Sequence, residues 1–295
     1  MTDLSTTAGK LAGLQQRLEE AHAPRGEKAV EATHEAGRLT ARERVEYLLD
    51  HDSFVEIDAL ARHRVEAHGL DADRPATDGV VAGYGTVDGR KICVFAQDRD
   101  IFDGRLGEVH GEKITKVQKL AATTGVPLVA FLEGAGARAA ENVAAMAFYS
   151  TIIAGQAKAS GLIPQVSVVT GELTGPHALL ASLADFTVMV EGGAAVSLTP
   201  PEIITTVTGA EVDPAADLGA QAHAATSGTA HLTAADDASA VTAVAELLGV
   251  LPANNRAEAP RDLDARVTGP ISENVTDRDR ELDAVIPDDS TVPYL

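Results

Sequence analysis

Short apolar runs alternate with longer amphipathic segments through the middle of the chain. Residues 80–87 and 91–96 are mostly apolar, and the Asp88-Gly89 pair between them supplies the positive φ angles of a tight hairpin turn. After this hairpin the pattern predicts strands at 126–132, 163–170, 186–191 and near 196, and helices at 106–124, 138–159, 176–184, 201–207 and 236–249. Strands that alternate with helices in this way predict an α/β fold with a largely parallel sheet.

The two ends of the chain have different patterns. The first residues are charged and helical in period, with Leu11, Leu14 and Leu18 on one helical face and a capping box formed by Thr40 and Glu43. Because this segment has little core of its own, we expect it to lie against another part of the fold or another subunit. The predicted organisation has three parts: a helical segment (1–65), an α/β domain (66–255) and an acidic extended tail (256–295).

Composition excludes several classes of partner. The chain has 44 acidic and 24 basic side chains, and a formal net charge of -20 opposes binding to nucleic acid. No stretch approaches the roughly 18 apolar residues that cross a bilayer. The one cysteine, Cys93, lies in an apolar run, which favours a buried, inert thiol and a reducing cytoplasm. His223 and His231 have no other ligands at metal spacing, so we expect no metal site.

Two turns that contain glycine follow predicted strands. Residues 134–139, Gly-Ala-Gly-Ala-Arg-Ala, formally match a dinucleotide-binding fingerprint, but no carboxylate stands about 20 residues further on to hold a ribose. Backbone N–H groups at such a turn can instead hold a negatively charged oxygen, and glycine lets a thioester approach the backbone closely. A second passage of this character spans residues 170–177. Two such turns that face one pocket would direct backbone N–H groups at the negatively charged oxygen of an enolate.

The side chains near these turns have two interpretations each. His177 is either a base or hydrogen-bond donor, or a surface or capping residue. Glu133 and Glu141 are expected as capping or ion-paired carboxylates rather than as catalytic acids. A charged run on the helix predicted at 106–124 is expected to be a solvated face with i,i+4 ion pairs, and its lysines are alternative phosphate ligands: Glu108, Glu112, Lys113 and Lys116.

Ordered motifs run along the chain from about residue 36 to its end, at 78–89, 95–98, 106–114, 159–165, 185–190, 207–209, 226–231 and 251–255. Together they resemble the carboxyltransferase (beta) subunit of biotin-dependent acyl-CoA carboxylases, especially the propionyl-CoA type. The resemblance implies a crotonase-like fold, a spiral of ββα units behind the N-terminal helical segment. It also implies that this fold binds a CoA thioester and stabilises its enolate while a carboxyl group passes to or from biotin.

The chain departs from the family pattern at three places. The family's Ala-Gly-Gly-Ala oxyanion loop is Thr-Gly-Pro-His at residues 174–177, and proline has no N–H to donate. Loss of one oxyanion donor typically costs about 2.7 to 4 kcal/mol of transition-state stabilisation. The family's Ser-Gly-Gly-Ala-Arg is Gly-Ala-Gly-Ala-Arg at 134–138, and its Phe-Gly-Gly-Ser is Phe-Asp-Gly-Arg at 102–105. Residues 286–295 resemble the family's linker into a second crotonase-like domain, which supplies the carboxybiotin half of the site.

The resemblance then implies a set of site residues. Arg138 is either a contact to a ligand carboxylate or phosphate, or the partner of Glu141 or Glu133 in an ion pair. The expected catalytic residues are Gly136, Ala137, Gly175 and His177, and the expected substrate-binding residues are Gly134, Ala135, Arg138, Gly104 and Arg105.

Three functions remain open. The first is a half-length carboxyltransferase subunit that acts with a partner chain for the biotin half. The second is a stand-alone, biotin-independent decarboxylase or related enolate-forming enzyme on a CoA or carrier-protein thioester. The third is a non-catalytic homologue that acts as a binding partner. No cofactor is expected to be covalently bound, biotin is expected only through a partner, and the resemblance suggests a homo-oligomer, a trimer or hexamer.

Overall fold

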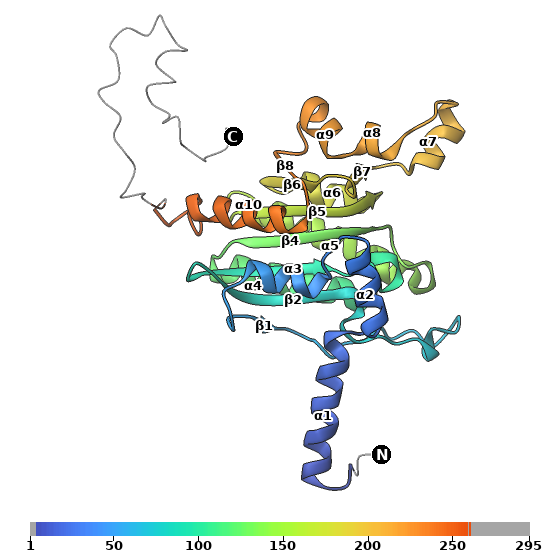
Figure 1. Cartoon of the computed structure of the whole chain (residues 1–295), viewed down its shortest axis with the longest axis vertical. Helices are drawn as coiled ribbons and strands as arrows, with labels where there is room; N and C mark the ends of the chain where they lie inside the picture. The colour runs from blue at the N-terminus through green and yellow to red at the C-terminus, as the bar shows by residue number, and fades with distance from the viewer. Residues whose placement is uncertain (1–3, 259, 261–295) are drawn as a thin grey trace, which may run out of the picture. The chain divides into compact units, whose positions relative to one another are not determined.

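One mixed sheet organises residues 4–258 and 260, which are the residues that this computed structural model describes (Figure 1). The strand order is β1-β2-β3-β4-β5-β6-β8, and β7 pairs with β5. The pairs β1–β2 and β2–β3 are antiparallel, and the other pairs are parallel, so the predicted α/β class and largely parallel sheet are confirmed. The strands are β1 (Val55–Glu56), β2 (Val80–Val87), β3 (Arg90–Gln97), β4 (Leu128–Ala135), β5 (Gln165–Thr174), β6 (Phe186–Val190), β7 (Ala195–Ser197) and β8 (Leu232–Ala234).

Helices cover both faces of this sheet. Side chains of α3 and α10 pack on one face, and side chains of α4, α5 and α6 pack on the other. None of the described helices is long and apolar enough to cross a membrane. Their bounds are α1 (Thr7–His22), α2 (Glu27–Glu35), α3 (Ala41–Leu48), α4 (Glu108–Thr124), α5 (Asn142–Ala159), α6 (Pro176–Ser182), α7 (Pro201–Thr208), α8 (Pro214–Leu218), α9 (Ala220–Ala222) and α10 (Asp237–Val250).

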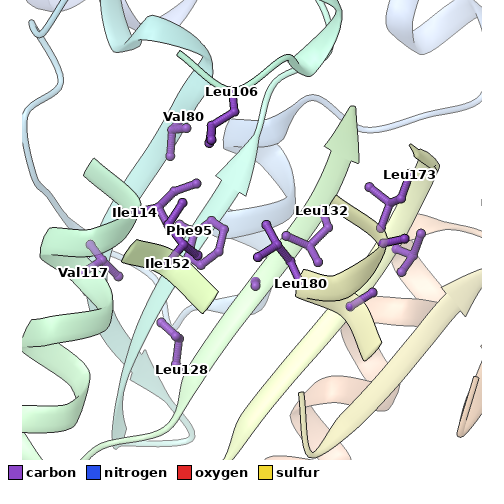
Figure 2. Close-up of a cluster of buried hydrophobic side chains, with 14 of the residues drawn as sticks. Val80, Phe95, Leu106, Ile114, Val117, Leu128, Leu132, Ile152, Leu173 and Leu180 are labelled. Atoms are coloured by element: carbon purple, nitrogen blue, oxygen red, sulfur yellow. The ribbon is translucent and has the colours of Figure 1, made fainter. Parts of the chain in front are cut away.

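The alternation of side chains along each strand builds two hydrophobic clusters. In β3, Cys93 and Phe95 face the cluster under α4 and α5, whereas Ile92 and Val94 face the cluster under α3 and α10. Figure 2 shows Phe95 in the first cluster, surrounded by side chains from the neighbouring strands and helices. Cys93 is 1% exposed, and burial raises the pKa of its thiol to about 11, which confirms the expected inert cysteine.

Local signals placed the hairpin and most of the helices correctly. Asp88 and Gly89 have φ angles of 49° and 74° between paired β2 and β3, as the turn requires. The helix predicted at 138–159 begins only at Asn142, because residues 139–141 form a 3₁₀ turn after the buried Arg138. The short elements β1, β8, α8 and α9 were not predicted, since they contain too few residues to show a period.

The N-terminal segment packs on the sheet, which confirms the expectation that it lies against another part of the fold. Val45 and Leu48 of α3 are buried in the cluster that also contains α10. The capping box is confirmed, because Thr40 Oγ1 accepts from the Glu43 N–H at 3.2 Å and the Thr40 N–H donates to Glu43 Oε2 at 2.8 Å. Leu11 of α1 remains 62% exposed. The predicted tail falls largely on 259 and 261–295, outside the described residues.

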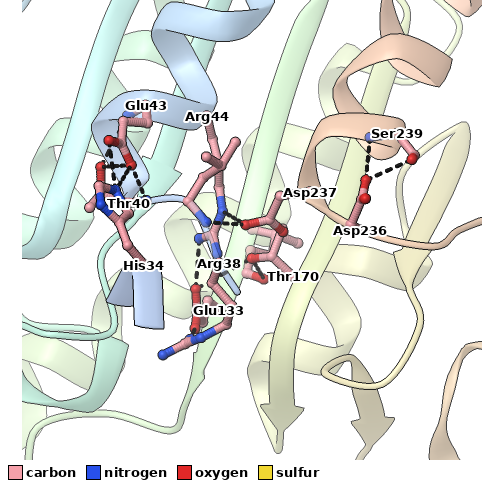
Figure 3. Close-up of polar contacts among 12 residues, drawn as sticks. His34, Arg38, Thr40, Glu43, Arg44, Glu133, Thr170, Asp236, Asp237 and Ser239 are labelled. Atoms are coloured by element: carbon pink, nitrogen blue, oxygen red, sulfur yellow. Dashed lines mark hydrogen bonds and ion pairs between the residues drawn. The ribbon is translucent and has the colours of Figure 1, made fainter. Parts of the chain in front are cut away.

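A buried ion network joins this N-terminal segment to the sheet. Arg44 of α3 donates to Glu133 Oε2 at 2.7 Å and to Asp237 Oδ2 at 3.0 Å, and Arg38 donates to Glu133 Oε1 at 2.8 Å (Figure 3). The Arg44 and Glu133 side chains are each 2% exposed. The expectation that Glu133 is ion-paired is therefore confirmed, and its position at the end of β4 is tied to α3 and α10.

Arg44→Met should lower the free energy of unfolding by about 3 to 5 kcal/mol, because it removes a cation from two buried carboxylates. Urea denaturation followed by circular dichroism measures this change. Arg64→Ala is the control, since the Arg64 side chain is 55% exposed in its ion pairs with Glu108 and Glu112. That variant should lose less than about 1 kcal/mol. Equal losses in the two variants would contradict the argument from burial.

Candidate functional site

Two loops lie against each other beyond the carboxyl end of β4. The Leu106 N–H donates to the Gly136 carbonyl at 3.0 Å, and the Arg138 N–H donates to the Leu106 carbonyl at 2.9 Å. Residues 102–106 and 134–138 are therefore joined as in a short parallel ladder. This contact brings together seven of the residues expected from the sequence: Gly104, Arg105, Gly134, Ala135, Gly136, Ala137 and Arg138.

The two loops meet through glycine on both sides. A Cβ atom on Gly104 would lie 2.4 Å from the Glu133 carbonyl oxygen, and a Cβ atom on Gly134 would lie 2.3 Å from the Gly104 carbonyl oxygen. By contrast, a Cβ atom on Gly136 would have no neighbour within 4 Å. Gly104 and Gly134 thus allow the backbones to touch, whereas Gly136 leaves open space on the exposed side of the loop.

The loop at 102–106 has a strained backbone. Phe102, Asp103 and Gly104 have φ angles of 53°, 56° and 67°, and this left-handed conformation is unfavourable for a bulky residue such as phenylalanine. The Phe102 ring is held by the guanidinium groups of Arg25 and Arg138, which lie 5.3 and 4.5 Å from its centroid. Such strain persists where surrounding contacts impose it, and it is concentrated at functional sites.

Arg138 connects these loops to the rest of the fold. Its side chain is 4% exposed and donates to Asp78 Oδ1 at 2.5 Å, to the Asp78 carbonyl at 2.9 Å and to Glu141 Oε1 at 3.1 Å. Its Nε donates to the Arg105 carbonyl at 3.0 Å. The ion pair with Glu141 confirms one expectation, and the alternative partner, Glu133, is wrong because Glu133 pairs with Arg38 and Arg44. The Arg138 guanidinium, which was expected as a substrate contact, therefore directs its donors to other parts of the protein.

Lys113 corrects the expectation of a solvated charged face on α4. Its side chain points inward, where Nζ donates to the Thr77 carbonyl at 3.0 Å and also to the Val80 carbonyl, and the residue is 1% exposed. Burial lowers the pKa of Lys113 to about 8. Lys116 does lie at the surface, in an ion pair with Asp58. The helical period of the sequence did not show that the Lys113 side chain points into the fold and donates to backbone carbonyls there.

In the loop between β5 and α6 (174–177), the backbone N–H of Gly175 and the side chain of His177 face the interior of the fold. The Gly175 N–H donates to the Ser197 carbonyl at 3.1 Å, so this amide, expected as an oxyanion donor, is already bonded. Pro176 is the first residue of α6 and has no N–H. The His177 side chain is 0% exposed, and burial lowers its pKa to about 3, so its imidazole is neutral.

The loop after β4 (134–138, the first loop) and the loop after β5 (174–177, the second loop) lie side by side, because β4 and β5 are neighbouring parallel strands with Ala135 paired to Thr174. This register directs the Gly136 N–H toward β5. The Ala137 N–H donates to no acceptor within the described residues, and Ala137 is partly exposed. Ala137 therefore presents an unpaired backbone donor at this edge of the sheet. A carbonyl oxygen that gains negative charge is the kind of group that such a donor binds.

Other residues of this region were not expected from the sequence. Asp78 anchors Arg138, while Gln97 and Tyr149 contact His177, with Gln97 Nε2 2.9 Å from His177 Nε2 and Tyr149 Oη 2.5 Å from His177 Nδ1. These three residues come from three separate segments of the chain. No local pattern predicts such contacts, because each depends on which strands and helices become neighbours.

Comparisons with known proteins agree with this arrangement. The profile described as the carboxyl transferase domain matches residues 32–295. The biotin-dependent acetyl-/propionyl-coenzyme A carboxylase beta5 subunit of Mycobacterium tuberculosis is 52% identical over 292 residues, which cover 99% of this chain and 53% of that protein. The methylmalonyl-CoA decarboxylase subunit alpha of Veillonella parvula is 41% identical over 99% of this chain and 56% of that protein. The chain spans about half the length of these curated relatives.

The fold is also similar to that of a solved structure. The transcarboxylase 12S structure, a hexamer assembly described with methylmalonyl-coenzyme A bound, has a TM-score of 0.86 and 34% identity, covering 93% of this chain and 53% of that chain. This similarity confirms the crotonase-like fold that the sequence motifs led us to expect.

Gly134→Ala should destabilise the protein by about 3 kcal/mol, because the new Cβ overlaps the Gly104 backbone. Gly136→Ala is the matched control. It also has a positive φ, 75°, but it has open space around it, so the loss should be about 1 kcal/mol. Thermal denaturation of both variants measures the difference. A Gly136→Ala variant that is the less stable of the two would contradict the close approach of the loops.

Asp98, next to Gln97, should make stability depend on pH. Burial, together with the charges of Asp100 and Glu133, raises the pKa of Asp98 to about 6. The folded state then binds more protons than the unfolded state between about pH 4 and 6, so the free energy of unfolding falls as pH rises through this window. Asp98→Asn should flatten this slope and add about 1 to 3 kcal/mol at pH 8. Urea denaturation at several pH values tests this, and an unchanged slope would contradict it.

Proposed function

Because the chain belongs to the carboxyl transferase domain family, we propose that it binds an acyl-CoA thioester and stabilises its enolate while a carboxyl group passes between the acyl group and biotin. The motifs, the family profile and the names of its relatives support this proposal. Biotin would come to the site on another protein, since the proposed reaction needs no cofactor attached to this chain. We also propose a homo-oligomer, a trimer or hexamer, as in the hexameric assembly named for transcarboxylase 12S.

The unpaired N–H of Ala137 carries the chemical part of this proposal. When a carboxyl group leaves C2 of a malonyl-type thioester, the C–C bond electrons pass to the thioester carbonyl, whose oxygen becomes negative. An N–H held in place before the reaction stabilises this charge without reorganisation. Gly136 forms the wall along which the thioester would approach, because its Cβ position is open space, and Gly134 supports this wall through its close contact with Gly104. Arg138 and Gly104 hold this wall, and we assign to the exposed Arg105 a contact with the CoA.

The second loop provides fewer oxyanion donors than the corresponding loop of the family motif. The Gly175 N–H is bonded to Ser197, and Pro176 has none, so we do not assign either as an oxyanion donor. The His177 imidazole is enclosed, so we assign it no direct contact with substrate. A single first-loop donor should leave the enolate less stabilised, by roughly the 2.7 to 4 kcal/mol that one such donor is worth.

A biotin-independent decarboxylation is the second candidate function. It needs the same enolate: the carboxyl group leaves as CO₂ instead of passing to biotin, and the enolate then takes up a proton at C2, so the reaction requires only the thioester pocket. The observation that favours it is the 41% identity to the protein named methylmalonyl-CoA decarboxylase subunit alpha. A CoA ester and a carrier-protein thioester present the same reacting group to this pocket.

The test uses the purified protein with malonyl-CoA and methylmalonyl-CoA, with and without free biotin. Mass spectrometry follows the loss of CO₂, the decarboxylated thioester and carboxybiotin. Formation of carboxybiotin with an equal amount of decarboxylated thioester would support carboxyl transfer. CO₂ loss that does not depend on biotin would support the decarboxylase instead. Thioesters that stay intact in every arm would contradict both and leave a binding partner without catalysis.

Pro176→Gly should increase kcat about 10- to 100-fold, because glycine restores an N–H at the position where the family motif has one. Initial rates with saturating methylmalonyl-CoA measure the change. Pro214→Gly is the control, since Pro214 also begins a helix, α8, but lies in a different part of the fold. That variant should keep the wild-type rate. A rate that is unchanged or lower in Pro176→Gly would show that the lost donor does not limit catalysis.

A further inference from the structure

A chain of buried polar side chains runs beneath the two loops. Tyr149 Oη lies 2.5 Å from His177 Nδ1, and Gln97 Nε2 lies 2.9 Å from His177 Nε2 and 3.0 Å from His110 Nε2. Gln97, His110 and His177 are each 0% exposed, and Tyr149 is 6% exposed. Because buried polar groups need defined partners, the protons in this chain are constrained by its geometry.

The orientation of the Gln97 amide follows from its third contact. The Glu133 N–H points at Gln97 Oε1 at 3.1 Å, and a backbone N–H can only donate, so the amide oxygen must face Glu133. The amide nitrogen then faces both histidines and donates one hydrogen to each Nε2. A neutral imidazole that accepts at Nε2 carries its proton at Nδ1. His177 is therefore assigned as the neutral Nδ1–H tautomer. His110 is assigned in the same way, because its Nε2 lies 3.0 Å from Gln97 Nε2, a closer contact than the 3.5 Å between its Nδ1 and Arg138 Nη2, which can only donate.

This assignment extends to Tyr149. The His177 Nδ1–H donates to Tyr149 Oη, so the phenolic proton must point away from His177. Burial raises the pKa of Tyr149 and lowers the pKa of both histidines, which keeps the whole chain uncharged near neutral pH. The positive charges of Arg138 and Lys113 lower the pKa of His110 further.

We propose that Gln97 is a positioning residue that couples the two loops of the site. It accepts from Glu133, the residue before Gly134 in the first loop, and donates to His177 in the second loop. Through these bonds it keeps the spacing of the loops and fixes the tautomer of both histidines. The inference rests on the proposed function for its effect on catalysis, whereas the hydrogen-bond chain itself is independent of that function.

Among the groups around this hydrogen-bond chain, Gln97 is the one that decides which ring nitrogen of each histidine carries the proton. Asp78 faces His110 only through its bond to the His110 N–H, at 2.8 Å, and is paired with Arg138. The Glu133 carboxylate is turned to Arg38 and Arg44. Arg138 Nη2 lies 3.5 Å from His110 Nδ1, and the Lys113 ammonium is bonded to backbone carbonyls. A carboxylate at position 97 would therefore be the first negative charge in direct contact with both imidazoles.

Gln97→Glu is the test, because it keeps the shape of the side chain but removes both donated hydrogens. One oxygen still accepts from Glu133, and the other must accept a proton from an imidazole Nε2. Long-range ¹H–¹⁵N spectra of ¹⁵N-histidine-labelled protein report which ring nitrogen carries the proton, with His177→Asn and His110→Asn used to assign the signals. In the wild type both Nε2 atoms should be unprotonated from pH 5 to 8. In Gln97→Glu at least one should gain a proton and titrate within this range.

Gln118→Glu is the matched control. Gln118 is also buried, and its Nε2 donates to the Ile152 carbonyl, away from the histidines. It should lose stability, as Gln97→Glu does, but keep the wild-type histidine signals. A wild-type protein with a proton on either Nε2, or a Gln97→Glu variant with unchanged signals, would overturn the assigned chain.

Steady-state kinetics with methylmalonyl-CoA tests the positioning role. Gln97→Glu should lower kcat about 10- to 100-fold with little change in KM, and kcat should acquire a pH dependence between pH 5 and 8 that wild type and Gln118→Glu do not have. A Gln97→Glu variant with the kcat, KM and pH profile of Gln118→Glu would overturn the role. If wild type turns over no thioester, the proposed function and this role both fail, while the spectra still decide the hydrogen-bond chain.

Discussion

The buried guanidinium of Arg138 is the contact on which the shape of the site depends. It joins three segments that are far apart in the sequence, through the Asp78 carboxylate and carbonyl, the Arg105 carbonyl and Glu141. A buried charge with so many donors is stable only if each finds an acceptor. The loops at 102–106 and 134–138 therefore have one arrangement that satisfies Arg138, and the left-handed backbone at Phe102 is maintained by it.

The contacts of Glu133 fix the position of the loops at 102–106 and 134–138 relative to the sheet. Glu133 is bonded through its side chain to Arg38 and Arg44 and through its N–H to Gln97. The residue just before the glycine wall is thus held by the N-terminal helices on one side and by the histidine chain on the other. The N-terminal segment, with α3 in the core, supports the site from a distance.

The chemistry of the site follows from how few backbone donors remain unpaired. The close contact between Gly104 and Gly134 joins the two backbones, open space lies beside Gly136, and the Ala137 N–H has no acceptor among the described residues. The second loop offers no free N–H at Gly175 or Pro176, because the Gly175 N–H is bonded to the Ser197 carbonyl and Pro176 has no N–H. His177, which stands where the family motif has alanine, fills the space behind that loop and binds Gln97 and Tyr149. The side chain thus contributes to the structure of the loop and not to its exposed surface.

The sequence by itself determined the elements and the family. Alternation and turn residues such as Asp88-Gly89 predicted the hairpin and the order of strands and helices, because these depend on neighbours in the chain. Ordered motifs identified the glycine loops. Only the tertiary structure decided what each side chain does: Lys113 and Arg138 are turned inward, Glu133 pairs with α3, and Gln97 lies between two histidines. These contacts join residues distant in the sequence, and burial, which local pattern does not reveal, decides whether a charged group faces a ligand or the protein.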